Sequence, residues 1–278
     1  MFFAVLLVAM PHNSPDARRQ MIRECRKIYK NDFIEKKNID KFDKEYRACD
    51  AIHWYTRSGF LSILINKTLR SENVYALYIF RYFIFDLCEN LAAARYSSST
   101  PISVYRGTIL RREEVEQLRV GSLVSTNGFL SSSRCIDVAL SFMSSNQDAH
   151  STNNRSRNDA YQFVLFQIVI DLNQSPDVIV ADISNQSCIK DEEEFLFDLG
   201  TTFSITKIFY DENRFCWTIE MIGSNQVAQL NHQYDSYIRE RLSETSATIL
   251  FGRMLAHLSE YSLAIKYFHR LLKILPNS

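Results

Sequence analysis

Four consecutive acidic residues, at positions 191–194, lead directly into the apolar run Phe195-Leu196-Phe197. If this segment is a strand, its side chains alternate between the two faces, and Glu192 and Glu194 project to one side about 6 to 7 Å apart. Carboxylates at that separation can divide a reaction between them, one stabilising a developing cation and the other orienting or deprotonating a nucleophile. A solvated acidic loop before an edge strand is the alternative.

A basic residue stands inside another apolar run, Val104-Tyr105-Arg106-Gly107. The Arg106 guanidinium needs an anionic partner, and guanidinium groups bind phosphate oxygens bidentately. An internal salt bridge to one of the glutamates is the alternative. Gly107 lacks a Cβ and would let a ligand approach the backbone closely. The segment therefore predicts either a phosphate clamp or a structural ion pair on a strand.

Three serines end a third apolar segment, Phe129-Leu130-Ser131-Ser132-Ser133, just before a helical pattern that begins at Ile136. Alone, hydroxyls at a strand-to-helix junction are most often an N-cap with turn-forming neighbours. Their position in the chain, after the arginine and before the glutamates, makes them candidates for the same site.

Other catalytic and binding templates are missing from the sequence. It contains no GxGxxG, GxxxxGK[ST], HExxH or GxSxG motif, and its six histidines are scattered. Its six cysteines are widely spaced without a CxxC pair, which argues against a zinc site or a compact disulfide scaffold and favours reduced thiols. We expect no metal cofactor and, with secretion left open, a cytoplasmic protein.

Composition and charge limit the classes of partner. The 278 residues are 46% hydrophobic and 23% charged, which indicates a globular chain rather than a disordered one. With 32 basic and 32 acidic side chains, the chain lacks the surplus charge that non-specific nucleic-acid or anionic-membrane binding requires, although a local patch stays open. The apolar stretches Phe2–Met10 and Val74–Phe85 are too short to cross a bilayer, and we expect the first to form a buried element rather than a signal peptide.

The pattern of apolar residues divides the chain into three regions. Residues 1–97 have helical spacing and few glycines or prolines. A turn cluster at 97–101 opens a β-rich region that ends near residue 225, and helical periodicity returns at Gln226. The expected strands are 103–110, 122–133, 161–170, 177–183, 193–199, 203–210 and 214–222, and residues 144–159 are expected to form a surface loop.

The last helical pair has the residue pattern of a single helix-turn-helix repeat. Gly252 and Ala264 are small where two antiparallel helices would approach closely. Tyr261 would fill the turn between them, and Pro276 would end the second helix. The pattern resembles a tetratricopeptide repeat, with an ordinary amphipathic hairpin as the alternative. Because a lone repeat cannot bury both of its faces, the repeat interpretation predicts further chain beyond Ser278 or a protein partner on these helices.

Taken in chain order, Tyr105-Arg106-Gly107, Phe129-Leu130-Ser131-Ser132-Ser133 and Glu192-x-Glu194 resemble the arginine, serine and ExE motifs of the arginine-specific mono-ADP-ribosyltransferases. The wider likeness runs from about Ala51 to Ile222 and, with the repeat attached, is similar to the invertebrate and fish members of that family. Ser132 stands where the family usually has threonine, and the loop 182–190 lacks the aromatic residue often found there.

The resemblance implies an α+β fold in which N-terminal helices precede a split pair of mainly antiparallel sheets that hold NAD⁺ in a cleft. It implies a catalytic domain over residues 1–225, which consists of a helical region over residues 1–97 and a β-rich core over residues 98–225, followed by helices over 226–278. The implied activity is transfer of ADP-ribose from NAD⁺, a substrate, to an arginine of an acceptor protein, with release of nicotinamide and without a metal.

The resemblance also assigns roles to individual residues. Arg106 would hold the NAD⁺ diphosphate, and the Gly107 backbone would approach the nicotinamide amide. Ser131 would fix Glu194, which would accept the ribose 2′-hydroxyl and stabilise the oxocarbenium-like state as nicotinamide leaves. Glu192 would bind the acceptor arginine and take its proton. Two alternatives stay open: an NAD⁺ glycohydrolase that uses the same residues, and a binding module with a vestigial cleft.

Overall fold

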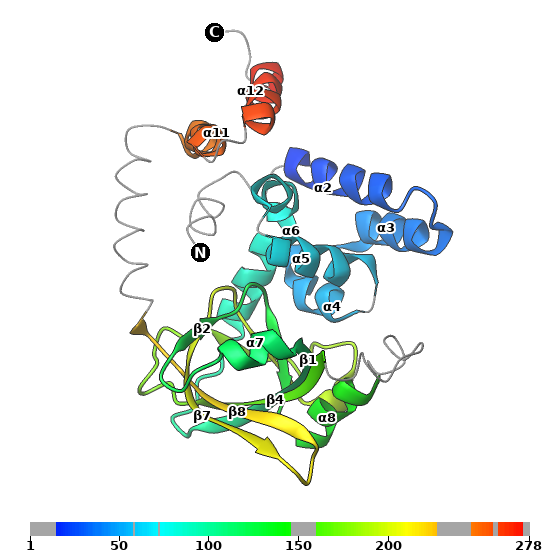
Figure 1. Cartoon of the computed structure of the whole chain (residues 1–278). Helices are drawn as coiled ribbons and strands as arrows, with labels where there is room; N and C mark the ends of the chain where they lie inside the picture. Colours follow the sequence, from blue (N-terminus) through cyan, green and yellow to red (C-terminus); the bar gives the residue numbers. More distant parts are fainter. Residues whose placement is uncertain are drawn as a thin grey trace. The chain divides into compact units, whose positions relative to one another are not determined.

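Figure 1 shows the chain as a computed structural model, which describes residues 15–57, 59–71, 73–145, 160–226, 246–257 and 261–274. Several expected features lie outside these residues: the first element at 2–10, most of the loop expected at 144–159, the return of the helical pattern over 227–245, and the helix stop at Pro276. Among the described helices, none combines the length and the apolar character needed to cross a membrane.

The chain folds into two compact units. The first, called the helical unit below, comprises Met1–Ala48, Ser58–Asp86 and Gln229–Ser278, and the second, called the sheet unit, comprises Cys49–Arg57 and Leu87–Ala228. The C-terminal helices therefore belong with the N-terminal ones. The helices that the structure describes in the first unit are α2 (Pro15–Ile28), α3 (Phe33–Glu45), α5 (Phe60–Ser71), the first section of α6 (Val74–Ala93), α11 (Ala247–His257) and α12 (Tyr261–Ile274).

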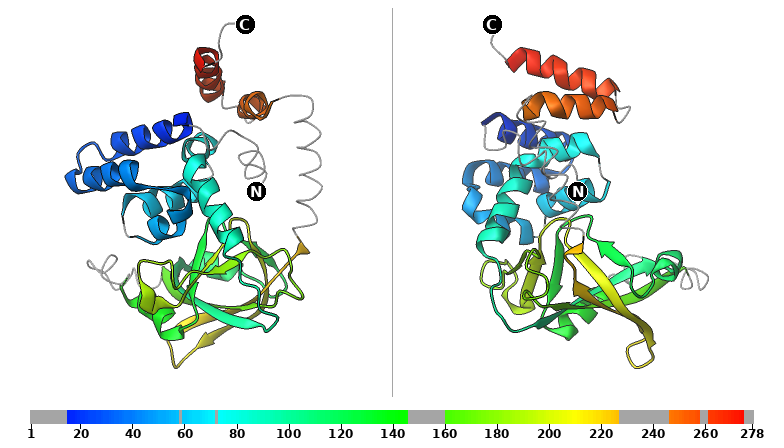
Figure 2. Two further views of the ribbon diagram at one scale, coloured as in Figure 1. Left: turned by 180° about the vertical axis from the view of Figure 1, so that it is seen from behind. Right: turned by 90° about the vertical axis from the view of Figure 1, so that its left-hand side faces the viewer.

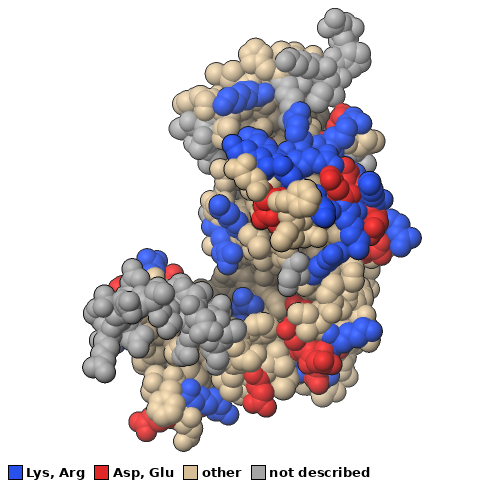
Figure 3. All heavy atoms as spheres, turned by 90° about the vertical axis from the view of Figure 1, so that its right-hand side faces the viewer, with Lys and Arg blue, Asp and Glu red and all other residues tan. Residues whose placement is uncertain are grey.

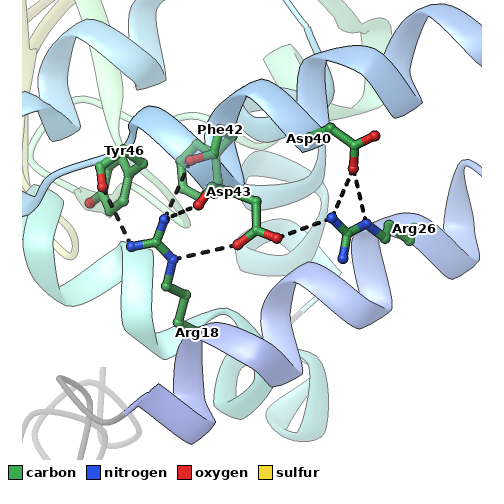
Figure 4. A network of polar contacts seen from close by, with 6 residues as sticks. All are labelled: Arg18, Arg26, Asp40, Phe42, Asp43 and Tyr46. Carbon is green, nitrogen blue, oxygen red and sulfur yellow. Dashed lines mark hydrogen bonds and ion pairs between the residues drawn. The ribbon is translucent and has the colours of Figure 1, made fainter.

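Helices α2 and α3 lie side by side as an antiparallel pair (Figures 1 and 2). Figure 4 shows the polar network that joins them. Arg18 of α2 donates to the Asp43 carbonyl at 2.6 Å and to the carbonyls of Phe42 and Tyr46 at 3.5 Å. Further along α2, Arg26 bonds the carboxylates of Asp40 at 2.8 Å and Asp43 at 3.0 Å. These contacts at two levels of the pair fix the register of the two helices.

The C-terminal helix pair α11 and α12 packs around a tyrosine of α6. Phe251 of α11 stacks on Tyr78 with ring centroids 5.0 Å apart, and Tyr267 of α12 meets Tyr78 edge-on at 5.2 Å. Gly252 permits the close approach of the two helices, because a Cβ there would lie 2.2 Å from the Phe268 ring. The expectation that Tyr261 fills the turn is wrong, because Tyr261 is 62% exposed. The buried tyrosine of this helix pair is Tyr267.

The sheet unit is built on eight strands in the order β2-β7-β8-β4-β1-β3-β6-β5. All neighbouring pairs are antiparallel except β4 and β8, which are parallel. The strands are β1 (Ile102–Arg111), β2 (Leu123–Ser125), β3 (Leu130–Ser133), β4 (Tyr161–Ile170), β5 (Val180–Asp182), β6 (Glu194–Phe197), β7 (Thr202–Asp211) and β8 (Cys216–Gly223). The short helices are α4 (Ala51–Thr56), α7 (Arg112–Gln117), α8 (Ile136–Ser145) and the 3₁₀ turn η2 (Lys190–Glu192), and the turn η1 (Ala48–Asp50) links the two units in sequence.

Two groups of strands meet at a narrow junction. Strands β1 and β4 pair along ten residues, whereas β1 and β3 pair only through Tyr105 and Ser133. The junction separates β2-β7-β8-β4-β1 from β3-β6-β5, and a shared apolar core that includes Val104, Phe195 and Ile219 packs between them. The predicted α+β class with a mainly antiparallel core is confirmed, and the two expected sheets are joined edge to edge at this pair.

Candidate functional site

The Glu194 carboxylate is held by two serine hydroxyls. Ser131 Oγ donates to Oε1 at 2.7 Å, and Ser187 Oγ donates to Oε2 at 2.9 Å. The residue is only 8% exposed, so both carboxylate oxygens are fixed in a largely dry position. One hydroxyl on each oxygen sets the plane of the carboxylate as well as its rotamer.

Strand pairing explains how Ser131 reaches Glu194. In the antiparallel pair β3–β6, Ser131 faces Leu196 and Ser133 faces Glu194. Glu194 is thus the diagonal neighbour of Ser131 on the same face, within reach of a short side chain. The register of these two short strands therefore produces the contact between Ser131 and Glu194 that the resemblance implies.

A tight turn after β5 brings the second serine to the same carboxylate. The Ile183 carbonyl accepts the amides of Gln186 at 2.8 Å and Ser187 at 2.7 Å, and the Ile183 amide donates to the Glu194 carbonyl at 2.9 Å. Ser187 is buried, and its Oγ also accepts the Ile189 amide at 3.2 Å. The loop 183–189 is therefore hydrogen-bonded to the start of β6 through both backbone and side chain.

This loop is also tied to helix α4 of the same unit. The Cys188 amide donates to Thr56 Oγ1 at 3.1 Å, and its thiol lies 3.4 Å from the His53 carbonyl and 3.5 Å from His53 Nδ1. The segment beginning at Ala51, where the family likeness starts, thus supports the loop that carries Ser187.

Glu192 lies close to Glu194, but strand alternation does not place it there. Strand β6 begins at Glu194, Glu192 ends the turn η2, and Glu193 between them has a left-handed backbone with φ 43° and ψ 52°. Ser133 Oγ donates to the Glu192 carbonyl at 2.6 Å, and the Arg134 amide donates to the Glu193 carbonyl at 3.2 Å. The expectation that both carboxylates project from one face of a strand is wrong, because these two contacts hold the chain in a turn.

The charge of Glu194 still influences the Glu192 carboxylate. Burial raises the pKa of Glu192 above its ordinary value, and the nearby charge of Glu194 raises it further. A carboxylate whose pKa is raised is a stronger base when it is ionised. Glu192 is half-buried, so it also remains accessible to a second reactant.

Arg106 joins the same cluster through the backbone of Ser131. Its Nη1 donates to the Ser131 carbonyl at 2.6 Å, and the side chain is half-buried. One serine therefore contacts the arginine through its carbonyl and the glutamate through its hydroxyl. Three of the residues predicted from the sequence, Arg106, Ser131 and Glu194, are brought together in a continuous chain of hydrogen bonds.

The reason for a glycine at position 107 is visible in helix α8. A Cβ on Gly107 would lie 1.9 Å from the Ala139 carbonyl oxygen and 2.9 Å from Met143 Cγ. The absent side chain therefore lets α8 approach strand β1. Because side chains alternate along a strand, Arg106 projects to the opposite face from α8.

Sequence reasoning missed Ser187 and the backbone roles of Ser133. Ser187 lies in a polar loop with Ser184, Asn185 and Gln186, and its type and spacing do not distinguish it from these neighbours. Only the folded loop shows which hydroxyl turns inward. Within the described residues, no group of three or more His, Cys, Asp or Glu side chains could hold a metal ion.

The similarity of this chain to known proteins is limited to solved structures. No family model matches it, and no curated protein matches it. Several solved structures are similar. The Vis toxin, an ADP-ribosyltransferase from Vibrio splendidus, is 20% identical over 80% of this chain and 91% of that chain, with a TM-score of 0.47.

Two further solved structures are similar to a comparable extent. The ADP-ribosyltransferase HopU1 of Pseudomonas syringae pv. tomato is 16% identical over 77% of this chain and 99% of that chain, with a TM-score of 0.48. The C3 exoenzyme of Clostridium limosum is 18% identical over 73% and 94%, with a TM-score of 0.44. At these values the similarities assign no activity and no residue role to this chain.

Proposed function

We propose that the chain is an NAD⁺-dependent mono-ADP-ribosyltransferase that modifies arginine. The observation that carries the proposal is the Glu194 carboxylate, clamped by Ser131 and Ser187 beside Arg106 and a second carboxylate whose pKa is raised. All of these residues belong to the sheet unit, so we assign the chemistry to that unit.

Glu194 is suited to stabilise a cation that forms during the reaction. An ionised carboxylate has about four acceptor positions, and the two serines occupy one on each oxygen, which leaves a second on each for a substrate hydroxyl. In the proposed reaction, the bond between C1′ of the ribose and the nicotinamide nitrogen breaks, and its electron pair leaves with nicotinamide. Positive charge then develops on the ribose, where a fixed carboxylate in a dry site is most effective.

Arg106 is proposed to bind the diphosphate of NAD⁺. A guanidinium has several N–H donors in one plane and can bind a phosphate while it keeps a bond to a carbonyl. Its bond to the Ser131 carbonyl places it next to the serine that orients Glu194. Binding of the diphosphate and orientation of the ribose would therefore be coupled through a single residue. The Gly107 backbone is proposed to lie against the nicotinamide amide.

Glu192 is proposed to act on the acceptor. A guanidinium is protonated at neutral pH and must lose a proton as its nitrogen forms the new bond to C1′. Glu192 would bind the guanidinium and take that proton, and its raised pKa makes it a better base than an ordinary glutamate. If water attacked instead of arginine, the same Glu194 chemistry would give NAD⁺ hydrolysis.

The test is incubation of the purified protein with NAD⁺ labelled in the adenylate and with agmatine as a small guanidinium acceptor. We expect labelled ADP-ribosyl-agmatine in excess over free ADP-ribose. Glu194→Gln should lower both products by at least about 100-fold, because a neutral amide cannot balance the developing charge. Glu193→Gln is the matched control, since Glu193 is an exposed carboxylate of the same run, and it should keep wild-type activity.

Two outcomes would contradict the proposal. Near-wild-type turnover by Glu194→Gln would remove Glu194 from the mechanism. Labelling of an acceptor protein without any transfer to agmatine, resistant to competition by free arginine, would exclude arginine as the acceptor.

A further inference from the structure

Three large apolar side chains are exposed together where α2 turns into α3. Ile28 ends α2 and is 49% exposed, and Phe33 and Ile34 begin α3 and are 71% and 73% exposed. Single exposed apolar residues are common, whereas several at one turn mark an interaction site. Residues 27–37 are called the α2–α3 tip below.

The lysines of the tip face the solvent. Lys30, Lys36 and Lys37 are exposed, and Lys37 Nζ lies 4.6 Å from the centre of the Phe33 ring. Lys27 is also exposed and pairs with Glu24 at 3.2 Å. Figure 3, viewed from the side on which the tip lies in Figure 1, shows many Lys and Arg over this region of the helical unit, with Asp and Glu between them. The apolar tip therefore has a basic rim.

The acidic groups of the tip are engaged by the protein itself. The Asp32 carboxylate caps α3 by accepting the Glu35 amide at 2.9 Å. The Glu35 carboxylate accepts the Phe60 amide at 3.2 Å and the Asn38 side-chain amide at 3.1 Å. These negative charges serve the fold, while Lys30, Lys36 and Lys37 are exposed for a partner.

The tip is also rigidly supported. The contacts of Arg18 and Arg26 with α3 fix the helix pair from which the tip projects (Figure 4). An interaction surface that is already ordered loses less conformational entropy on binding than a flexible one.

We propose that the α2–α3 tip docks on the surface of an anionic phospholipid bilayer. Phe33 and Ile34 would enter the boundary between headgroups and acyl chains, and the lysines would extend to the lipid phosphates. Because the net charge of the chain is zero, attraction to an anionic surface has to come from a local patch such as this one. The occupant to which we commit is a lipid surface, because its phosphates complement the lysines and its acyl boundary accepts the exposed apolar side chains.

The test is sedimentation of the full chain with phosphatidylcholine vesicles that contain about one third phosphatidylserine, compared with pure phosphatidylcholine. We expect binding to the anionic vesicles that weakens as salt is added. The double variant Phe33→Ser/Ile34→Ser should reduce the partition coefficient at least about tenfold, and Lys30→Gln/Lys36→Gln/Lys37→Gln should reduce it on the order of 100-fold. Ile265→Ser is the matched control, because Ile265 is 57% exposed on α12, outside the tip, and it should bind like the wild type.

Thermal unfolding of each variant checks that it is folded, and the exposure of the substituted side chains predicts small changes. Absence of binding to anionic vesicles would overturn the proposal, as would binding that none of the tip variants weakens. A change from dimer to monomer on Phe33→Ser/Ile34→Ser, without any vesicle binding by the wild type, would overturn it in favour of a second copy of the chain as the occupant.

Discussion

Ser187 Oγ bonds the Glu194 oxygen that Ser131 leaves unoccupied, at 2.9 Å in a buried position. Ser187→Ala removes this bond while Ser131 still holds the other oxygen. Because hydrogen bonds to charged groups contribute about 1.5–3 kcal/mol, we expect kcat for transfer to agmatine to fall about 10- to 100-fold. The KM for NAD⁺ should change little, because Arg106 is untouched. Steady-state kinetics with both substrates varied would measure the two effects.

Ser184→Ala is the control for that prediction. Ser184 lies in the same loop, but its hydroxyl bonds the exposed Asp182 carboxylate at 2.7 Å. We expect this variant to behave like the wild type. Equal kinetics for the two serine variants would mean that Ser187 does not position Glu194.

Glu192→Gln should separate transfer from hydrolysis. Glu192 is proposed to act on the acceptor, so agmatine transfer should fall at least about 100-fold while NAD⁺ hydrolysis persists. In the wild type, burial and the charge of Glu194 raise the pKa of Glu192. Glu192 is inactive as a base when protonated, so the rate of transfer should increase with pH through this raised pKa. The rate of NAD⁺ hydrolysis should not show this decrease at low pH, which is the acid limb of the pH profile.

A parallel loss of transfer and hydrolysis in Glu192→Gln would contradict this division of roles. An acid limb shared by both activities would do the same, since Glu192 has no proposed role in the departure of nicotinamide.

At the residue scale, the motifs predicted which side chains meet but not how the backbone brings them together. Arg106, Ser131 and Glu194 could be proposed because their neighbours indicated strands. The turn at Glu193 could not be proposed, since a left-handed backbone is uncommon for glutamate. It is held here by Ser133 at the end of β3 and by Arg134 just after it, both distant in sequence. Ser187 was missed because its type and spacing do not distinguish it from the other polar residues of its loop.

At the scale of elements, helix α8 and strand β1 are in contact because Gly107 has no side chain. Gly107→Ala would place a Cβ 1.9 Å from the Ala139 carbonyl, a backbone atom that cannot move without shifting the helix. We expect a loss of about 2–3 kcal/mol in the free energy of unfolding, measured by denaturant titration. Gly223→Ala is the control, since its Cβ would meet only side chains, at 3.3 Å or more. Equal stability of both variants would show that α8 does not pack on Gly107 as described.

Local patterns predicted strands but not which strands pair. Strand β4 covers Tyr161–Ile170, the range expected from its apolar run. The run 122–133 was expected to be one strand, but it forms β2 and β3, which are separated at Asn127-Gly128 and pair with β7 and β6 respectively. Contacts between distant segments decide which strands pair. The spacing of apolar residues within one segment does not show these contacts.

At the scale of the whole molecule, the C-terminal helices belong to the same compact unit as the N-terminal helices. The sequence predicts a C-terminal helix pair, and the pair is present as α11 and α12. Its resemblance to a repeat suggested a separate unit with an open face. Phe251 and Tyr267 are buried against Tyr78 of α6, so one face of the pair is covered within the helical unit, while Ile265 and Leu272 of α12 are exposed. Helical spacing predicts that an apolar face exists but not which segment covers it.

Phe251→Ala tests whether the C-terminal pair is an integral component of the helical unit. Phe251 is fully buried between Tyr78 and Tyr267, so the substitution should cost about 3–5 kcal/mol in stability. Hydrogen exchange should show faster exchange in α11, α12 and the Tyr78 region of α6, with strands β1, β4 and β8 unchanged. Leu272→Ala is the control, because Leu272 is exposed on α12. If Phe251→Ala left α6 as protected as in the wild type, the C-terminal helices would be an appended module. If it accelerated exchange equally in the strands, the two units would unfold as one.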